Sequence, residues 1–179
     1  MPLLFPERDP VARVLISDFF TSLISDIDQA KVEIIGSVYL FTGFNSSRLT
    51  DPIRLLNSLK KARARGVNVF LLINQRLDYA RPKREHRKLS EALKMSGIEF
   101  QLYPRSKIQH AKIFLIDGGI CFVGSHNLTQ GAVSKNLDVT VRYEDRELYS
   151  DLAFSLLSAC APPFPVRRQE VAENSTDSR

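Results

Sequence analysis

The fold of this 179-residue chain is decided by the stretch QHAKIFLIDGGICFVGSHNLTQGAVSKNLDVTV, which runs from Gln109 to Val141. Two apolar runs, Lys107 to Ile116 and Ile120 to Val123, are separated by the short turn Asp117-Gly118-Gly119. Apolar runs joined by a glycine-rich turn of this length are typical of a β-hairpin. The stretch therefore predicts two antiparallel strands that pair with each other.

Five polar side chains of this stretch fall near the ends of its predicted strands. His110 and Lys112 are two positions apart on an extended segment, so their side chains share one face. Ser125 and Asn127 also share a face just past the second strand, where they can reach the same pocket. Asp138 belongs to the following strand, and its carboxylate can bind a ring nitrogen and fix the tautomer of a histidine. The set combines a nucleophile, a cation, neutral donors and an orienting carboxylate.

The segments before the hairpin alternate between helix and strand. Apolar residues recur at helical spacing over residues 10–30, where Asp9 can cap a helix and Pro10 suits its first turn. A nearly continuous apolar run from Val32 to Phe41 predicts a strand that is buried on both faces. The remaining predicted elements are a helix over 51–66 opened by Asp51-Pro52 and closed by Gly66, a strand over 67–73, a loop over 74–83, a helix over 84–95 ending at Gly97, and a strand over 98–103.

After the hairpin, the pattern predicts a strand over residues 134–143 and a closing helix over 145–159 with an aspartate cap. The whole order predicts an α/β fold in which helices cover both faces of a mixed β-sheet. Prolines within residues 162–165 end the last helix. We expect one catalytic domain over residues 1–164, followed by a disordered tail or linker over 165–179, which holds few apolar residues.

The composition, 44% hydrophobic and 25% charged, is typical of a soluble globular domain. The apolar run Ile34 to Ser47 is uncharged over 14 residues, and no uncharged run in the sequence reaches 18. A membrane span needs roughly 18, so no membrane partner is expected. No secretory signal is visible before Glu7 and Arg8, which leads us to expect a cytoplasmic protein. Cys121 and Cys160 are expected to be small buried side chains rather than a disulfide or metal ligands.

Positive charge is concentrated between Lys60 and Lys112, where 14 Lys and Arg face four Asp and Glu, a local charge of +10. The rest of the chain carries 11 bases against 16 acids, or −5. Basic segments gain free energy when they neutralise phosphates and release counterions, which favours a polyanionic partner. The alternative is a charged helix face that is simply solvated. The candidates for nucleic-acid contacts are Lys83, Arg84, Arg87, Lys88, Arg105 and Lys107.

The spacing His110-x-Lys112-x4-Asp117-x6-Gly124-Ser125-x-Asn127 resembles the signature of the phospholipase D superfamily, usually called the HKD motif. Asn136-Leu137-Asp138 is similar to the family's later Asn-x-acid element, with Asp where Glu is common. The strand and helix order before the motif is also the order that this fold would show. The resemblance implies a phospholipase D-like domain, in which we expect Asp117 and Gly124 to be structural, Asp117 through local hydrogen bonds at the turn.

This resemblance implies phosphodiester chemistry without a metal or any other cofactor. His110 would attack phosphorus to form a covalent phosphohistidine, and a second histidine would protonate the leaving oxygen. Lys112, Ser125 and Asn127 would donate to the nonbridging oxygens as negative charge develops there.

The other two histidines have no second motif around them. His126 alternates away from Ser125 and Asn127, and His86 lies in a basic stretch, so we expect surface or supporting roles for both. Three scattered histidines without paired carboxylates match no standard ligand spacing, and no metal site is expected.

The chain carries one copy of the motif and no internal repeat, whereas the phospholipases proper carry two copies. The resemblance therefore implies a homodimer with its site on the twofold axis. Single-motif members are chiefly nucleases, and the segments Tyr39 to Phe44, His110 to Phe114 and Gly124 to Thr129 resemble the catalytic domains of metal-independent restriction endonucleases. We therefore expect a DNA endonuclease whose sequence recognition lies on another domain or subunit.

Three alternatives stay open. A phospholipid hydrolase or transferase would use the same chemistry, but it would need an interfacial apolar surface that the sequence does not show. A nucleic-acid-binding module without activity is disfavoured by the intact His110 and Lys112. A nonspecific nuclease for single-stranded DNA or RNA would fit the same basic residues.

Overall fold

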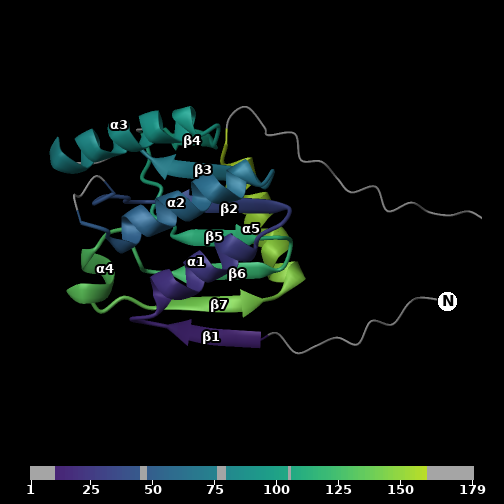
Figure 1. The fold of residues 1–179 in the computed structure, drawn as a ribbon. Coiled ribbons are helices and arrows are strands. Elements are labelled where there is room, and N and C mark those ends of the chain that lie inside the picture. The colour runs from purple at the N-terminus through teal and green to yellow at the C-terminus, as the bar shows by residue number, and fades with distance from the viewer. Residues whose placement is uncertain (1–10, 45–47, 76–79, 105, 161–179) are drawn as a thin grey trace, which may run out of the picture.

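A computed structural model describes residues 11–44, 48–75, 80–104 and 106–160 of the chain (Figure 1). The predicted hairpin is present as strands β5 (Ile113–Ile116) and β6 (Ile120–Gly124). The other described strands are β1 (Val11–Leu15), β2 (Glu33–Val38), β3 (Asn68–Asn74), β4 (Glu99–Tyr103) and β7 (Thr140–Glu144). The described helices are α1 (Phe19–Gln29), α2 (Asp51–Ala64), α3 (Ala80–Met95), α4 (Gly131–Ser134) and α5 (Arg146–Ser158).

The described strands form one sheet in the order β1-β7-β6-β5-β2-β3-β4, so the hairpin lies at its centre. β2, β3 and β4 are parallel neighbours, since α2 and α3 carry the chain back between them. β5, β6, β7 and β1 are antiparallel to their neighbours. The prediction of an α/β fold with a mixed sheet is confirmed.

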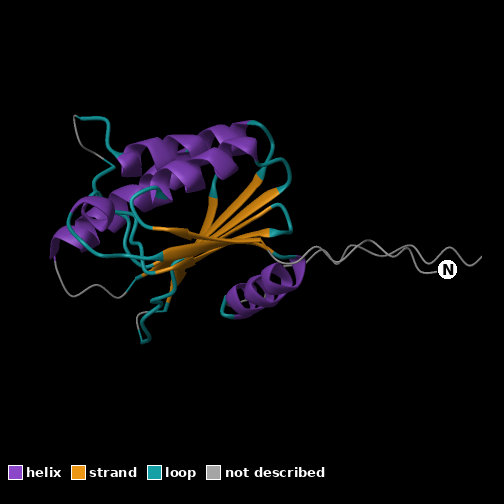
Figure 2. Cartoon of the chain, turned by 90° about the horizontal axis from the view of Figure 1, so that it is seen from below, coloured by secondary structure: helices purple, strands orange, loops and turns teal. Residues whose placement is uncertain are grey.

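Helices cover both faces of the sheet, as Figure 2 shows. Buried side chains of α1, α2 and α3 join the larger core, which includes Leu23, Leu59 and Leu89. Helix α5 packs on the opposite face through Tyr149 and Leu156, in a second core that also holds Cys121 and Cys160. Both cysteines are free and buried, as the sequence predicted. Within the described ranges no helix is long and apolar enough to cross a membrane.

The helix predicted over residues 10–30 is wrong in its first part. Residues Val11–Leu15 form the edge strand β1, which pairs antiparallel with β7, and the helix begins only at Phe19. The short run VARVL is compatible with both a helix and a strand. It forms a strand here because its backbone can pair with the edge of β7. Asp9 and Pro10, the predicted cap and first turn, lie outside the described residues.

Several other boundaries differ from the prediction. Helix α3 starts at Ala80, inside the predicted loop over 74–83, of which residues 76–79 lie outside the described ranges. The strand predicted over 134–143 is shorter, because Ser134 ends helix α4 and β7 starts at Thr140. The predicted tail over 165–179 also lies outside the described residues.

The predicted helix ends agree with the structure. Helix α2 opens at Asp51-Pro52, and Gly66 follows it with a φ of 93°, the left-handed conformation expected of a C-terminal cap. Helix α5 is capped by Asp145, whose side chain accepts a hydrogen bond from the backbone N–H of Leu148 at 2.9 Å.

Asp117 joins the hairpin turn to the start of β2. Its φ of 51° is left-handed, a conformation that aspartate tolerates better than most residues. Its carboxylate accepts backbone N–H bonds from Lys31 and Val32 at 2.8 Å and from Glu33 at 3.0 Å. The carboxylate is therefore structural, but its partners are distant in sequence, whereas the sequence analysis expected local backbone.

Replacement of Asp117 by Ala is expected to lower the free energy of unfolding by about 1.5–3 kcal/mol, since a charged acceptor is lost from three N–H groups. Urea denaturation of both proteins measures this difference. Asp151→Ala, an exposed position on α5, is the control and is expected to change stability by less than about 0.5 kcal/mol. Equal effects of the two substitutions would contradict the role of Asp117.

Candidate active site

The direction of the strands brings the predicted site residues to one end of the sheet. β5 runs antiparallel to β2 and β6, and β6 runs antiparallel to β7. The amino ends of β5 and β7 therefore lie beside the carboxyl ends of β2 and β6. His110 and Lys112 precede β5, Ser125 and Asn127 follow β6, and Asp138 precedes β7. These residues lie in the loops, because the strands are shorter than the sequence predicted.

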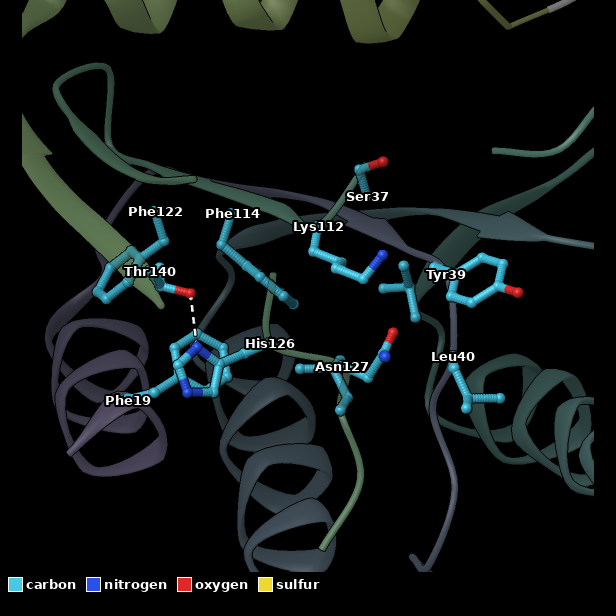
Figure 3. A pocket seen from close by; sticks show the side chains of 12 residues that line it. Phe19, Ser37, Tyr39, Leu40, Lys112, Phe114, Phe122, His126, Asn127 and Thr140 are labelled. Carbon is cyan, nitrogen blue, oxygen red and sulfur yellow. Dashed lines mark hydrogen bonds between the residues drawn. The ribbon is translucent and has the colours of Figure 1, made fainter. Parts of the chain in front are cut away.

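His110, Lys112 and Tyr39 form a compact cluster. The ring of His110 is exposed, and the Lys112 ammonium lies 3.4 Å from each of its two nitrogens. The same ammonium donates to the backbone oxygen of His110 at 2.7 Å and lies 4.6 Å from the centroid of the Tyr39 ring. Figure 3 shows Lys112 pointing into the pocket between Tyr39 and Asn127. Tyr39 was quoted in the sequence only as part of a resembling segment, and no signal marked it as a site residue.

The surroundings of His110 favour the neutral form of its imidazole. Partial desolvation lowers the pKa of His110 below its usual value, and the positive charge of Lys112 lowers it further. Desolvation also lowers the pKa of Lys112, while the Asp138 carboxylate opposes that change. A neutral exposed imidazole beside a cation is suited to nucleophilic attack on an anionic group.

Ser125 and Asp138 are bonded to each other. The Ser125 hydroxyl donates to Asp138 Oδ1 at 2.7 Å and accepts the backbone N–H of Val139 at 3.0 Å. The amide of Asn136 donates to the other Asp138 oxygen at 3.3 Å. Asp138 was expected to orient a histidine, but within this chain its two oxygens bind Ser125 and Asn136 instead.

Asn127 lines the pocket, and one of its polar side-chain atoms has no hydrogen-bond partner within the described residues. Its Oδ1 atom is buried and makes no hydrogen bond within the described residues. Because buried polar atoms are nearly always paired, an unpaired one at a candidate active site points to a ligand. The side-chain amide also carries two N–H donors. A rotation of the amide group by 180° would present these donors to the same ligand.

Gly124 allows β6 and β7 to approach closely beside the site. A Cβ atom at this position would overlap Thr140 and the backbone oxygen of Val139. The close approach lets the N–H of Ser125 donate to that same Val139 oxygen at 2.8 Å. Gly124 thereby helps to fix the backbone that presents Ser125.

His126 and His86 are not surface residues, contrary to one of the two roles expected for them. The His126 ring is buried and stacked on Phe19 at 4.4 Å. It donates from Nε2 to the carbonyl of Ile16 at 2.9 Å, so its Nδ1 accepts from the Thr140 hydroxyl at 2.8 Å. The ring therefore anchors the loop that carries Ser125 and Asn127.

His86 likewise anchors a segment beside the site, the one that follows β2. Its Nε2 accepts the backbone N–H of Phe41 at 3.1 Å, and Nδ1 lies 3.2 Å from the carbonyl of Asn74. Because a carbonyl only accepts, Nδ1 carries the proton. Helix α3 is thereby tied to the ends of β2 and β3, a link that a histidine in a basic stretch gives no reason to expect.

Gln109 is a further residue that the sequence analysis missed. Its backbone N–H donates to the Asn74 side chain at 3.2 Å, and its own amide contacts Ser37 and donates to the Ala111 carbonyl at 2.7 Å. Gln109 is buried, and these contacts fix the backbone next to His110. A lone glutamine before the motif carries no sequence signal for such a role.

The predicted basic residues whose side chains are described lie on helix α3 and in the loop before His110. Arg84, Arg87 and Lys88 are exposed on α3, and Lys107 is exposed in the loop before His110. Arg87 lies 4.0 Å from Glu91, at the limit of an ion pair. Arg105 and the side chain of Lys83 lie outside the described part of the chain. Among the residues that are described, no group of three or more His, Cys, Asp or Glu side chains is arranged to hold a metal.

Fold and site together define a phospholipase D-like domain, and comparisons with known proteins agree. The family described as "Cardiolipin synthase, PLD-like domain" matches residues 23–156. The chain belongs to this family.

Among curated proteins, cardiolipin synthase B of Salmonella typhi is 33% identical over 131 residues, which are 73% of this chain and 29% of that protein. A phospholipase D of Rickettsia conorii is 30% identical over 126 residues, which are 70% of this chain and 56% of that protein. The chain thus spans less than a third of cardiolipin synthase B and little more than half of the Rickettsia protein.

Two solved structures have the same fold. Nuc from Salmonella typhimurium, titled a phospholipase D family member, aligns with a TM-score of 0.70 and 24% identity, over 84% of this chain and 94% of its own. NucT from Helicobacter pylori aligns with a TM-score of 0.67 and 18% identity, over 84% of this chain and 96% of its own.

The two buried histidines make stability depend on pH. Burial lowers the pKa of His86 and of His126 below the ordinary 6.5, although hydrogen bonds to backbone oppose the change. The unfolded chain therefore binds protons that the folded chain does not, and the histidine contribution is complete above about pH 6.5 and is lost as pH falls. We expect urea denaturation to show a falling free energy of unfolding between pH 7.5 and 5.5. His86→Gln and His126→Gln should each flatten this dependence, and an unchanged slope in both variants would contradict it.

Proposed function

We propose that this domain is a phosphodiesterase that cleaves DNA through a covalent intermediate on His110. The observation that carries the proposal is the exposed imidazole of His110 with the Lys112 ammonium 3.4 Å from both of its nitrogens. Asn127 lines the pocket, and its amide can supply neutral donors, while Ser125 lies at the same end of the sheet with its hydroxyl proton donated to Asp138. A nucleophile beside a cation and an amide is suited to attack on a phosphate ester, whose nonbridging oxygens gain negative charge in the transition state.

The proposed reaction has two steps. A ring nitrogen of His110 attacks phosphorus, the N–P bond forms and the bond to the leaving oxygen breaks while a second histidine gives that oxygen a proton. Water then attacks the phosphohistidine, gives its proton to the second histidine and releases His110. Lys112 stabilises the nonbridging oxygens in both transition states, a contribution of about 10²- to 10³-fold for one donor in other enzymes.

We propose that the second histidine comes from a second copy of the chain. The sequence contains three histidines, and His86 and His126 have both ring nitrogens in hydrogen bonds inside the fold. Neither can serve as a proton donor at the site without leaving those bonds. We therefore propose a homodimer in which one His110 is the nucleophile and the other is the acid.

Exposed apolar side chains near the site support this dimer. Leu137 is 86% exposed and Val139 is 42% exposed, on the segment that also carries Asp138. Val14 and Ile16, at the nearby end of β1, are 61% and 48% exposed. A concentration of apolar surface of this kind is typical of an interaction site, and its position beside Ser125 suits a shared active site.

Exposed basic residues favour a nucleic acid over a lipid as substrate. Helix α3 begins beyond the carboxyl end of β3, at the same end of the sheet as the site, and exposes Arg84, Arg87 and Lys88. A phosphodiester of DNA arrives with neighbouring phosphates that such residues can bind. A restriction-type enzyme would need a further domain or subunit to read base sequence.

A phospholipid hydrolase or transferase is the second candidate. Sequence similarity to a cardiolipin synthase and to a phospholipase D favours it, since phospholipids offer the same phosphodiester group.

The deciding experiment incubates the protein with double-stranded DNA, single-stranded DNA, RNA and labelled phospholipid vesicles, in excess EDTA and in Mg²⁺. We expect DNA cleavage at equal rates in both buffers, a loss of at least about 10³-fold in His110→Ala, and a loss of about 10²- to 10³-fold in Lys112→Ala. Arg146→Ala, exposed at the opposite end of the sheet, is the control and should keep full activity. An absolute need for Mg²⁺, or a His110→Ala rate within tenfold of wild type, would overturn the mechanism. Turnover of lipid alone would support the second candidate.

The shared site is tested by mixing protomers. Wild-type protein and excess His110→Ala protein are allowed to exchange, and the nicking of supercoiled plasmid is followed. Because each site would need both His110 side chains, heterodimers should be inactive and the rate should fall in proportion to their content. Heterodimers that keep half or more of the wild-type rate would show that each protomer works alone. One site per dimer also predicts that nicked circles accumulate before linear DNA.

A further inference from the structure

Tyr39 lies against both reactive side chains of the site. Its ring centroid is 4.4 Å from that of His110, with the planes tilted by 59°, and the Lys112 ammonium lies 4.6 Å from the same centroid. The ring is only partly buried, so it borders the pocket and does not belong to the core. Figure 3 shows it beside Lys112 at the mouth of the pocket.

The backbone around Tyr39 is held firmly. Tyr39 directly follows β2, and the next residue, Leu40, accepts a hydrogen bond from the N–H of Leu128 at 2.9 Å. Phe41 is fully buried and donates its N–H to His86 at 3.1 Å. Two separate parts of the fold thus fix the chain within two residues of Tyr39, and a ring on such a support is a rigid surface.

The side chains of His110 and Lys112 are held by few contacts, of which the shortest hydrogen bond joins the Lys112 ammonium to the backbone oxygen of His110 at 2.7 Å. Within the described chain, the His110 ring has Lys112 as its hydrogen-bond partner, at the long distance of 3.4 Å. Lysine has four rotatable bonds, and holding it in one place costs conformational entropy. The Tyr39 ring is in contact with both groups and can reduce that freedom through ring stacking and attraction of the cation.

We propose that Tyr39 is a positioning residue that holds Lys112 against the His110 ring and so keeps both side chains in the orientation that the reaction needs. This inference rests on the proposed function, in which His110 attacks phosphorus. The phenol hydroxyl is not needed, because the ring face makes the contacts. Phenylalanine should therefore replace Tyr39, and an aliphatic side chain should not.

The electrostatic consequence can be measured. The charged groups that face the His110–Lys112 pair are Asp138, from the loop before β7, and, in the proposed dimer, the second His110. Partial desolvation lowers the pKa of His110, and Lys112 at its present position lowers it further. Without the Tyr39 ring, Lys112 is free to move away, and the pKa of His110 should rise toward its ordinary value.

The experiment compares wild type with Tyr39→Phe, Tyr39→Leu and a matched control, Tyr143→Leu. Tyr143 is a partly buried tyrosine on β7 that packs toward α5, away from the site. The pKa of His110 is measured by NMR of the imidazole C–H signals, with His110→Ala used for assignment. Cleavage rates are measured over pH at saturating and at low DNA concentration.

In Tyr39→Leu we expect the His110 pKa to rise, the acid limb of the rate profile to move to higher pH, and kcat to fall about tenfold with little change in KM. Tyr39→Phe and Tyr143→Leu should resemble wild type in all three respects. An unchanged His110 pKa and kcat in Tyr39→Leu, or a Tyr39→Phe protein as impaired as Tyr39→Leu, would overturn the inference. If the His110 pKa rises but wild type cleaves no phosphodiester, Tyr39 keeps its positioning role and the proposed function fails.

Discussion

The three hydrogen bonds that Asp117 accepts from the start of β2 are the constraint on which the site depends. They lie at the end of the sheet opposite the site, yet they fix the turn of the hairpin against β2. The register follows from there, with Ile34 opposite Ile116 and Ser37 opposite Ile113. A slip by one residue would send every side chain of β5 to the other face. The contact between Lys112 and Tyr39 depends on this register, which the Asp117 hydrogen bonds fix at the opposite end of the sheet.

A second level of support surrounds the loops of the site. His126 anchors the loop of Ser125 and Asn127 to the segment before α1, and His86 ties the segment after β2 to α3. Gln109 fixes the residue before His110. All three side chains are buried. The exposed side chains of the site therefore stand on loops whose backbones are held in place by buried hydrogen bonds.

The sequence predicted the hairpin, the sheet class and the grouping of five polar residues, because hydrophobic period and motif spacing are local properties. It did not predict strand β1, since a five-residue run at a sheet edge is decided by its partner β7. The burial of His86 and His126 also depends on segments that are distant in sequence, 45 residues away for Phe41 and 110 for Ile16. Tyr39 follows an apolar strand and looks like part of it until the structure places His110 beside its ring.

The engagement of both buried histidines has a consequence for the behaviour of the protein in a cell. If the catalytic acid must be borrowed from another copy, the amount of active enzyme rises with the square of protomer concentration at low abundance. On the proposed function, activity would then appear only as copies accumulate. A shared site would thus set a threshold of abundance without any inhibitor, because His86 and His126 are already engaged in hydrogen bonds within the fold.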